Sequence, residues 1–142
     1  MTHSNDPDLV RRLLTTPATW AVVGLSANKA RVAHGVAGFI KDGLGMRIVP
    51  VNPRSEDAHG ETGYARLADV PAPVDVVDCF VNSSRVGTVI DDAIAERERL
   101  GISAVWLQLG VIDDDAAQRA RDAGLDVVMD TCPAIEAPRL GL

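Results

Sequence analysis

The sequence is poor in aromatic residues, in cysteine and in long apolar runs. Only 4% of its 142 residues are Phe, Trp or Tyr, and it has two cysteines, Cys79 and Cys132. Two cysteines do not make the dense, even pattern of a disulfide-rich secreted domain, so we expect both to be reduced thiols. No apolar run approaches the roughly 18 residues that a membrane-spanning helix needs, and the first residues lack the basic-then-apolar order of a secretory signal. These absences predict a cytoplasmic protein with no membrane partner.

Positive charge is also scarce. The chain has 14 Lys and Arg against 20 Asp and Glu, a net charge of −6, and the basic residues are scattered along it. A protein that neutralises several phosphates of a duplex needs a clustered basic face, so no nucleic-acid partner is expected. No spacing of Cys and His resembles a zinc site, and we expect no metal.

What the chain does have is a regular alternation of apolar strands and amphipathic helices. With 46% apolar residues, residues 1–142 are enough for one domain, preceded by a leader helix and tail within 1–17. Because no hairpin signal separates the strands, we expect an α/β, Rossmann-like, doubly wound parallel sheet of about five strands, with helices on both faces and strand order 3-2-1-4-5. The expected strands are 20–24, 46–51, 74–81, 103–108 and 125–129. The expected later helices are 36–44, 84–100 (capped by Ser84 and ended by Gly101) and one from 113 or 114 to 123, with a short turn near 65–69.

In such a sheet, ligands bind beyond the carboxyl ends of the strands. The first strand ends in Gly24-Leu25-Ser26 and leads through a polar loop into a helix, an arrangement suited to holding phosphate on backbone N–H groups. The second strand ends in Asn52-Pro53-Arg54, where an NAD-binding fold would present a carboxylate. Replacing the acid with a base favours a ligand that carries a phosphate at this point.

Several segments, taken in order, resemble the stand-alone CoA-binding proteins. These proteins are similar to the amino-terminal domain of the succinyl-CoA synthetase alpha subunit without its partner domain. The resemblance runs from about residue 10 to residue 140. The segments that carry it are 21–26, 48–53, 60–64, 74–80, 105–111, 123–132 and 135–136.

The resemblance implies coenzyme A as the ligand. It implies that the loop after the first strand wraps the pyrophosphate, that Lys29 and Arg31 add charge, and that Arg54 holds a nucleotide phosphate. Many relatives have an arginine directly after the Phe of the third strand, where this chain has Val81, so one cationic anchor is missing. The implied binding residues are Gly24, Leu25, Ser26, Ala27, Asn28, Lys29, Asn52, Pro53, Arg54, Val81, Asn82, Ser83, Leu107, Gln108, Leu109 and Cys132.

The leading hypothesis for function is a CoA or acyl-CoA binding protein, without catalysis, that serves carriage, regulation or thiol protection. No nucleophile, base and orienting group can be recognised together, and no catalytic residue is assigned. Two alternatives stay open: an NADP-dependent oxidoreductase with Arg54 on the ribose 2′-phosphate, and an interaction module without a ligand. Cys132 is either close enough to the CoA thiol for a mixed disulfide or simply a semi-buried apolar side chain, and Cys79 is expected to be inert. A homodimer is a further possibility.

Overall fold

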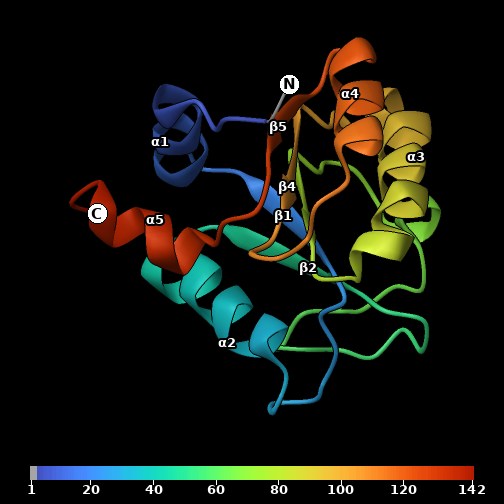
Figure 1. Ribbon diagram of the computed structural model, residues 1–142. Coiled ribbons are helices and arrows are strands. Elements are labelled where there is room, and N and C mark those ends of the chain that lie inside the picture. Colours follow the sequence, from blue (N-terminus) through green and yellow to red (C-terminus); the bar gives the residue numbers. More distant parts are fainter. Residues whose placement is uncertain (1–2) are drawn as a thin grey trace.

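The computed structural model describes residues 3–142, which form a five-stranded, all-parallel sheet between two layers of helices (Figure 1). The strands are apolar at consecutive positions because helices cover both faces of the sheet. The predicted single-domain, Rossmann-like α/β fold is therefore confirmed. The strands are β1 (Thr19–Val23), β2 (Arg47–Val51), β3 (Val76–Cys79), β4 (Ala104–Leu107) and β5 (Asp126–Val128).

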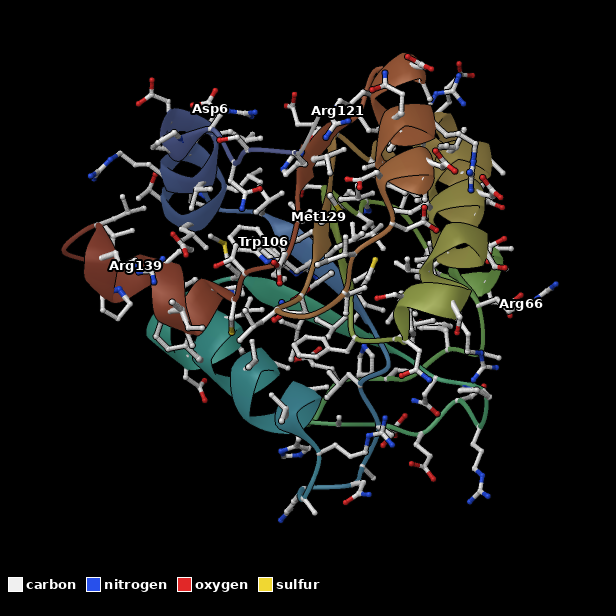
Figure 2. The ribbon with its side chains drawn as sticks, viewed as in Figure 1. Asp6, Arg66, Trp106, Arg121, Met129 and Arg139 are labelled. Carbon is white, nitrogen blue, oxygen red and sulfur yellow. The ribbon has the colours of Figure 1, made fainter. Side chains whose placement is uncertain are left out.

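The helices divide between the two faces of the sheet. Helices α3 and α4 cover one face, whereas α1, α2 and α5 cover the other (Figure 1). The second face holds Trp106, which is fully buried between the strands and these helices (Figure 2). The helical elements are α1 (Pro7–Thr15), α2 (Val32–Gly38), the π-helical turn η1 (Phe39–Gly43), the 3₁₀ turn η2 (Leu67–Asp69), α3 (Ser83–Leu100), α4 (Asp114–Asp122) and α5 (Pro133–Arg139).

The strand order is β2-β1-β3-β4-β5, so the predicted order 3-2-1-4-5 is wrong. Strand β2 lies at an edge, which suits Pro50 because proline has no N–H to donate to a neighbouring strand. Strand β3 pairs directly with β1, and their carboxyl ends meet at Gly24 and Phe80. The winding therefore reverses between β1 and β3, and this is where a ligand site is expected in such a sheet.

The helices differ from the predicted ones at three points. Helix α2 begins at Val32, before the predicted start at residue 36. Ser84 does not cap α3, because the helix begins at Ser83 and Asn82 occupies the N-cap position. The Ser83 hydroxyl instead donates to the Gly110 carbonyl and accepts from the Ile112 N–H, which ties α3 to the segment after β4. Helix α5 was not predicted at all. The predicted end of α3 at Gly101 is confirmed, because this residue is left-handed, with φ of 83°.

Helix α1 packs the start of the chain against the sheet. The Asp6 side chain caps α1 by accepting the Asp8 N–H, and the helix buries Val10, Leu13 and Leu14. Just before it, the Asn5 carboxamide makes hydrogen bonds with both the N–H and the carbonyl of Met129, near the end of β5 (Figure 2). Residues 1–2 of the predicted tail lie outside the described residues. Within residues 3–142, none of the helices combines the length and apolarity needed to cross a membrane.

Candidate functional site

A cleft of about 1350 Å³ lies at the carboxyl ends of β1, β2, β3 and β4. Small-molecule sites usually measure about 300–1,000 Å³, so this volume suits a large or elongated ligand. The walls come from the β1–α2 loop, the segment after β2, the start of α3 and the segments after β4 and β5. The site expected from the strand pattern is therefore a real hollow of the molecule.

The floor of the cleft depends on Gly24, the first residue after β1. Its φ is +104°, and a Cβ placed on it would lie 2.3 Å from the Phe80 carbonyl oxygen. No other residue fits, because a side chain would collide with the backbone at the end of β3. Gly24 thus allows β1 and β3 to approach closely where the winding reverses.

The loop from Ser26 to Ala30 is held in shape by its own side chains. The Ser26 hydroxyl accepts from the Asn28 N–H at 3.2 Å, and the Asn28 carboxamide oxygen accepts from the Ala30 N–H at 3.0 Å. The Ala27 N–H donates to the Glu56 carboxylate, also at 3.2 Å. Three N–H groups of the predicted phosphate loop are therefore directed at protein oxygens.

Asn52 ties this loop to the segment after β2. The residue is 5% exposed, and its amide nitrogen donates to the carbonyls of Leu25 (3.0 Å) and Glu56 (2.9 Å). Its carboxamide oxygen accepts from the N–H groups of Arg54 and Glu56. Because both donors and both acceptor positions are used, Asn52 positions the wall of the cleft and has no free polar group for a ligand.

The lining of the cleft is rich in arginine. Arg31, Arg54, Arg66 and Arg85 line it, against two acids, Glu56 and Asp92. Arg66 projects outward (Figure 2) and pairs with Asp69 at 3.6 Å, whereas the other three have no ion-pair partner among residues 3–142. Burial raises the pKa of Asp92, and neighbouring Asp91 raises it further. These unpaired cations suit a ligand with several anionic groups.

The lining also includes exposed apolar side chains. Val32, at the start of α2, and Leu109, after β4, line the cleft and are 75% and 61% exposed, so both are free to cover a ligand. Phe80 and Ile135 line the same hollow. The lining of the cleft therefore combines cationic and apolar side chains.

Two buried polar side chains lie at the β4 end. Gln108 lines the cleft but is only 4% exposed, and its amide nitrogen donates to Asp78 Oδ1 at 2.6 Å. Asp78, on β3, is completely buried, and burial raises its pKa to about 8 despite this hydrogen bond. Burial therefore favours the neutral form of this carboxyl group at pH 7.

Cys132 lines the cleft and is 8% exposed. Burial raises the pKa of its thiol, so the thiolate form is scarce at neutral pH. Cys79 is fully buried on the opposite face of the sheet, and burial raises the pKa of its thiol as well. Both cysteines are free thiols.

The structure brings most of the predicted binding residues to the cleft. Those that line it are Gly24, Ser26, Asn28, Asn52, Pro53, Arg54, Val81, Asn82, Gln108, Leu109 and Cys132. Five do not line it. The Leu25 and Leu107 side chains are fully buried in the core, Ser83 holds the segment after β4, and Ala27 and Lys29 are exposed beside the hollow.

Several residues of the site were not singled out from the sequence. Arg85 lies in the first turn of α3, one turn beyond Val81, where the resemblance places a cation. Its position in the first turn of the helix that follows the third strand was a usable signal. Asp78 interrupts an otherwise apolar strand, which was also a signal. Nothing local in the sequence marks Glu56 or Arg66.

Comparison with known proteins connects this geometry to a family. A family profile described as "CoA binding domain" matches residues 18–138. An uncharacterised protein, YneT of Bacillus subtilis (strain 168), is 29% identical over 123 residues, which cover 87% of this chain and 87% of that protein.

Solved structures give the same picture. A Thermus thermophilus protein is 33% identical, with a TM-score of 0.85 over 96% of this chain and 99% of that chain. A dinucleotide-forming acetyl-coenzyme A synthetase of Ca. Korarchaeum cryptofilum, in complex with phosphate and ADP, is 26% identical. Its TM-score is 0.68 over 83% of this chain, but the match spans only 26% of that longer protein. The fold thus occurs both alone and as one part of a larger enzyme.

Proposed function

Because the chain belongs to the CoA binding domain family, we propose that it binds coenzyme A in the cleft at the carboxyl ends of β1–β4. The observation that carries this proposal is the presence of unpaired arginines and exposed apolar side chains in one hollow. CoA is a nucleotide with a pyrophosphate and a 3′-phosphate, joined to a long arm that contains amides and ends in a thiol. Its two halves need these two kinds of side chain.

The distribution of charge gives the ligand a direction. The β1–α2 loop and Arg54 lie beside β1 and β2, and they suit the phosphates. Phe80, Leu109 and Cys132 lie toward β3, β4 and β5, and they suit the pantetheine arm. In this proposal Arg85, on the first turn of α3, supplies the cation that Val81 does not.

Isothermal titration calorimetry with CoA, dephospho-CoA and NADP tests the proposal. We expect CoA to bind tightest and dephospho-CoA to bind more weakly, because it lacks the 3′-phosphate. Binding of NADP without binding of CoA would favour an oxidoreductase instead. Absence of heat with all three nucleotides would favour an interaction module and would overturn the proposal.

We also propose that the protein holds CoA or acyl-CoA rather than converting it. The raised pKa of Cys132 supports this view, because a thiol nucleophile acts as its thiolate. Acetyl-CoA should remain intact when it is incubated with the protein for hours. The release of free thiol, which measures its hydrolysis, should not exceed the rate in buffer. Thiol release above the buffer rate would show hydrolysis, and mass spectrometry would show any acyl group transferred to the chain.

A further inference from the structure

Gln108 is a buried side chain with one polar atom left over. Its amide nitrogen is committed to Asp78 Oδ1 at 2.6 Å, and the residue is 4% exposed. Among residues 3–142 the side-chain oxygen of Gln108 accepts no hydrogen bond. This oxygen is not fully enclosed by protein atoms. Since Gln108 lines the cleft, that oxygen is open to the cleft.

Asp78 fixes which end of the carboxamide faces the cleft. It lies in the middle of β3, in register with Val22 on β1 and Trp106 on β4, and it is completely buried among these apolar neighbours. In this structure Asp78 Oδ1 accepts from the Gln108 nitrogen, so the nitrogen lies on the inner side and the carboxamide oxygen is the end left toward the cleft.

We propose that Asp78 is a positioning residue that orients the Gln108 carboxamide, so that its oxygen presents a hydrogen-bond acceptor to an amide N–H of the bound pantetheine arm. This inference rests on the proposed function. The amide is the donor of choice because Gln108 is followed directly by the apolar Leu109 and shares the cleft lining with Cys132 and Phe80, a setting that suits the uncharged pantetheine arm better than the phosphates. A buried acceptor without a partner is costly, so a ligand donor there gains affinity.

The variants for the test are Asp78→Leu, Asp78→Asn and Gln108→Leu. Leucine keeps the branching and approximate volume of Asp78 in an apolar setting, but removes the acceptor. Asparagine keeps an acceptor for the Gln108 nitrogen. Gln118→Leu is the matched control, because Gln118 is an exposed glutamine on α4 that hydrogen-bonds Asp122. Thermal unfolding without ligand establishes that each variant folds.

Calorimetry with CoA and with adenosine 3′,5′-bisphosphate, which lacks the pantetheine arm, gives the readout. We expect Gln108→Leu and Asp78→Leu each to weaken CoA binding by about three- to tenfold, the effect of one neutral hydrogen bond. Asp78→Asn and Gln118→Leu should bind CoA like the parent. The double variant with leucine at both Asp78 and Gln108 should be no weaker than Gln108→Leu alone, because Asp78 acts through Gln108. None of the variants should alter binding of the bisphosphate.

Three results would overturn the inference while leaving the proposed function intact. They are parent-like CoA binding by Asp78→Leu, additive losses in the double variant, and an equal loss of bisphosphate affinity, which would indicate a general disturbance of the cleft. If the parent protein itself does not bind CoA, the proposed function and this inference both fail.

Discussion

The Glu56 carboxylate accepts a hydrogen bond from the Ala27 N–H at 3.2 Å, so an acidic side chain from the segment after β2 contacts the loop that follows β1. Glu56 also lines the cleft. Backbone N–H groups in such a loop are the usual partners of phosphate. The negatively charged Glu56 side chain therefore already accepts from a backbone N–H group that a phosphate ligand would use.

Replacing Glu56 with glutamine should strengthen CoA binding. The amide can still accept from Ala27, but the negative charge beside the phosphates is gone, and we expect a gain of about three- to tenfold at low salt. Calorimetry at low and high ionic strength measures the gain, which should shrink as salt screens the charge. Glu98→Gln, an exposed residue of α3 that does not line the cleft, is the control. Weaker binding by Glu56→Gln would show that the carboxylate supports the loop more than it opposes the ligand.

Gly24→Ala should destabilise the fold. A methyl group there would lie 2.3 Å from the Phe80 carbonyl oxygen, at a φ of +104°. We expect a loss of at least about 3 kcal/mol in the free energy of unfolding, or roughly 10 °C in melting temperature. Gly45→Ala is the control, because Gly45 also has positive φ (+72°) but has open space around it, and it should cost only about 1 kcal/mol. Equal losses at the two positions would rule out the close approach of β1 and β3 as the cause.

The main elements of the fold could be predicted from the sequence, but the order of the strands could not. Apolar runs bounded by Gly and Pro are local signals, and they marked all five strands. Strand order depends instead on long-range contacts, such as the approach of Gly24 to Phe80, which no local pattern reports. Helix α5 was missed because Pro138 lies inside it, and proline usually breaks a helix.

The position of the site could be predicted from the strand pattern, but the hydrogen bonding of its side chains could not. Parallel strands bring their carboxyl ends to one edge, so the strand pattern located the cleft. The saturation of Asn52 by four hydrogen bonds depends on a folded turn and a neighbouring loop. The burial of Leu107 could have been foreseen, because side chains alternate along β4 and Gln108 points to the other side.

Asp78→Asn should make stability less dependent on pH. Burial raises the pKa of Asp78 to about 8 in the folded protein, against a reference value of 3.8. The folded state therefore keeps a proton that the unfolded state has released, and stability is lost as pH rises from the lower value to the higher. Relative to Asp78→Asn, the parent should lose about 1.4 kcal/mol per pH unit between about pH 5 and pH 7.

Urea unfolding of both proteins across this pH range measures that difference. Asp126→Asn is the control, because Asp126 is exposed at the edge of the sheet and pairs with Arg12. A constant difference between parent and Asp78→Asn from about pH 5 to pH 7 would mean that Asp78 is ionised in the folded protein.

Arg54→Gln and Arg85→Gln should show which phosphate of CoA each arginine contacts. If Arg54 holds the 3′-phosphate, Arg54→Gln should weaken CoA binding by about tenfold or more and leave dephospho-CoA binding unchanged. If Arg85 serves the pyrophosphate, Arg85→Gln should weaken both ligands. Calorimetry at low salt measures these losses, and Arg11→Gln, on the exposed side of α1, is the control. Equal effects of Arg54→Gln on both ligands would remove Arg54 from the 3′-phosphate.

Cys132 should react slowly with iodoacetamide at pH 7 and faster as pH rises. The thiolate is the reactive form, and burial raises the pKa of this thiol above its ordinary value. Cys79 should not react in the folded protein, because it is fully buried. Bound CoA should slow the reaction further if the pantetheine arm covers Cys132. Mass spectrometry of the modified protein, with and without CoA, reports both the rate and the cysteine that reacts.

The same thiol allows a direct test of how far the CoA arm reaches. Incubation with CoA disulfide transfers one CoA to the chain if Cys132 attacks: a protein–CoA disulfide forms, and one molecule of CoA thiol is released. We expect this adduct to accumulate slowly at pH 7 and to be absent from Cys132→Ser, whereas Cys79→Ser should form it like the parent. Because attack requires the ligand sulfur to reach Cys132 Sγ, an adduct specific to Cys132 would place the thiol end of CoA at the β5 side of the cleft. If the adduct persists in Cys132→Ser, or if no adduct forms at any pH, the thiol end of CoA lies elsewhere.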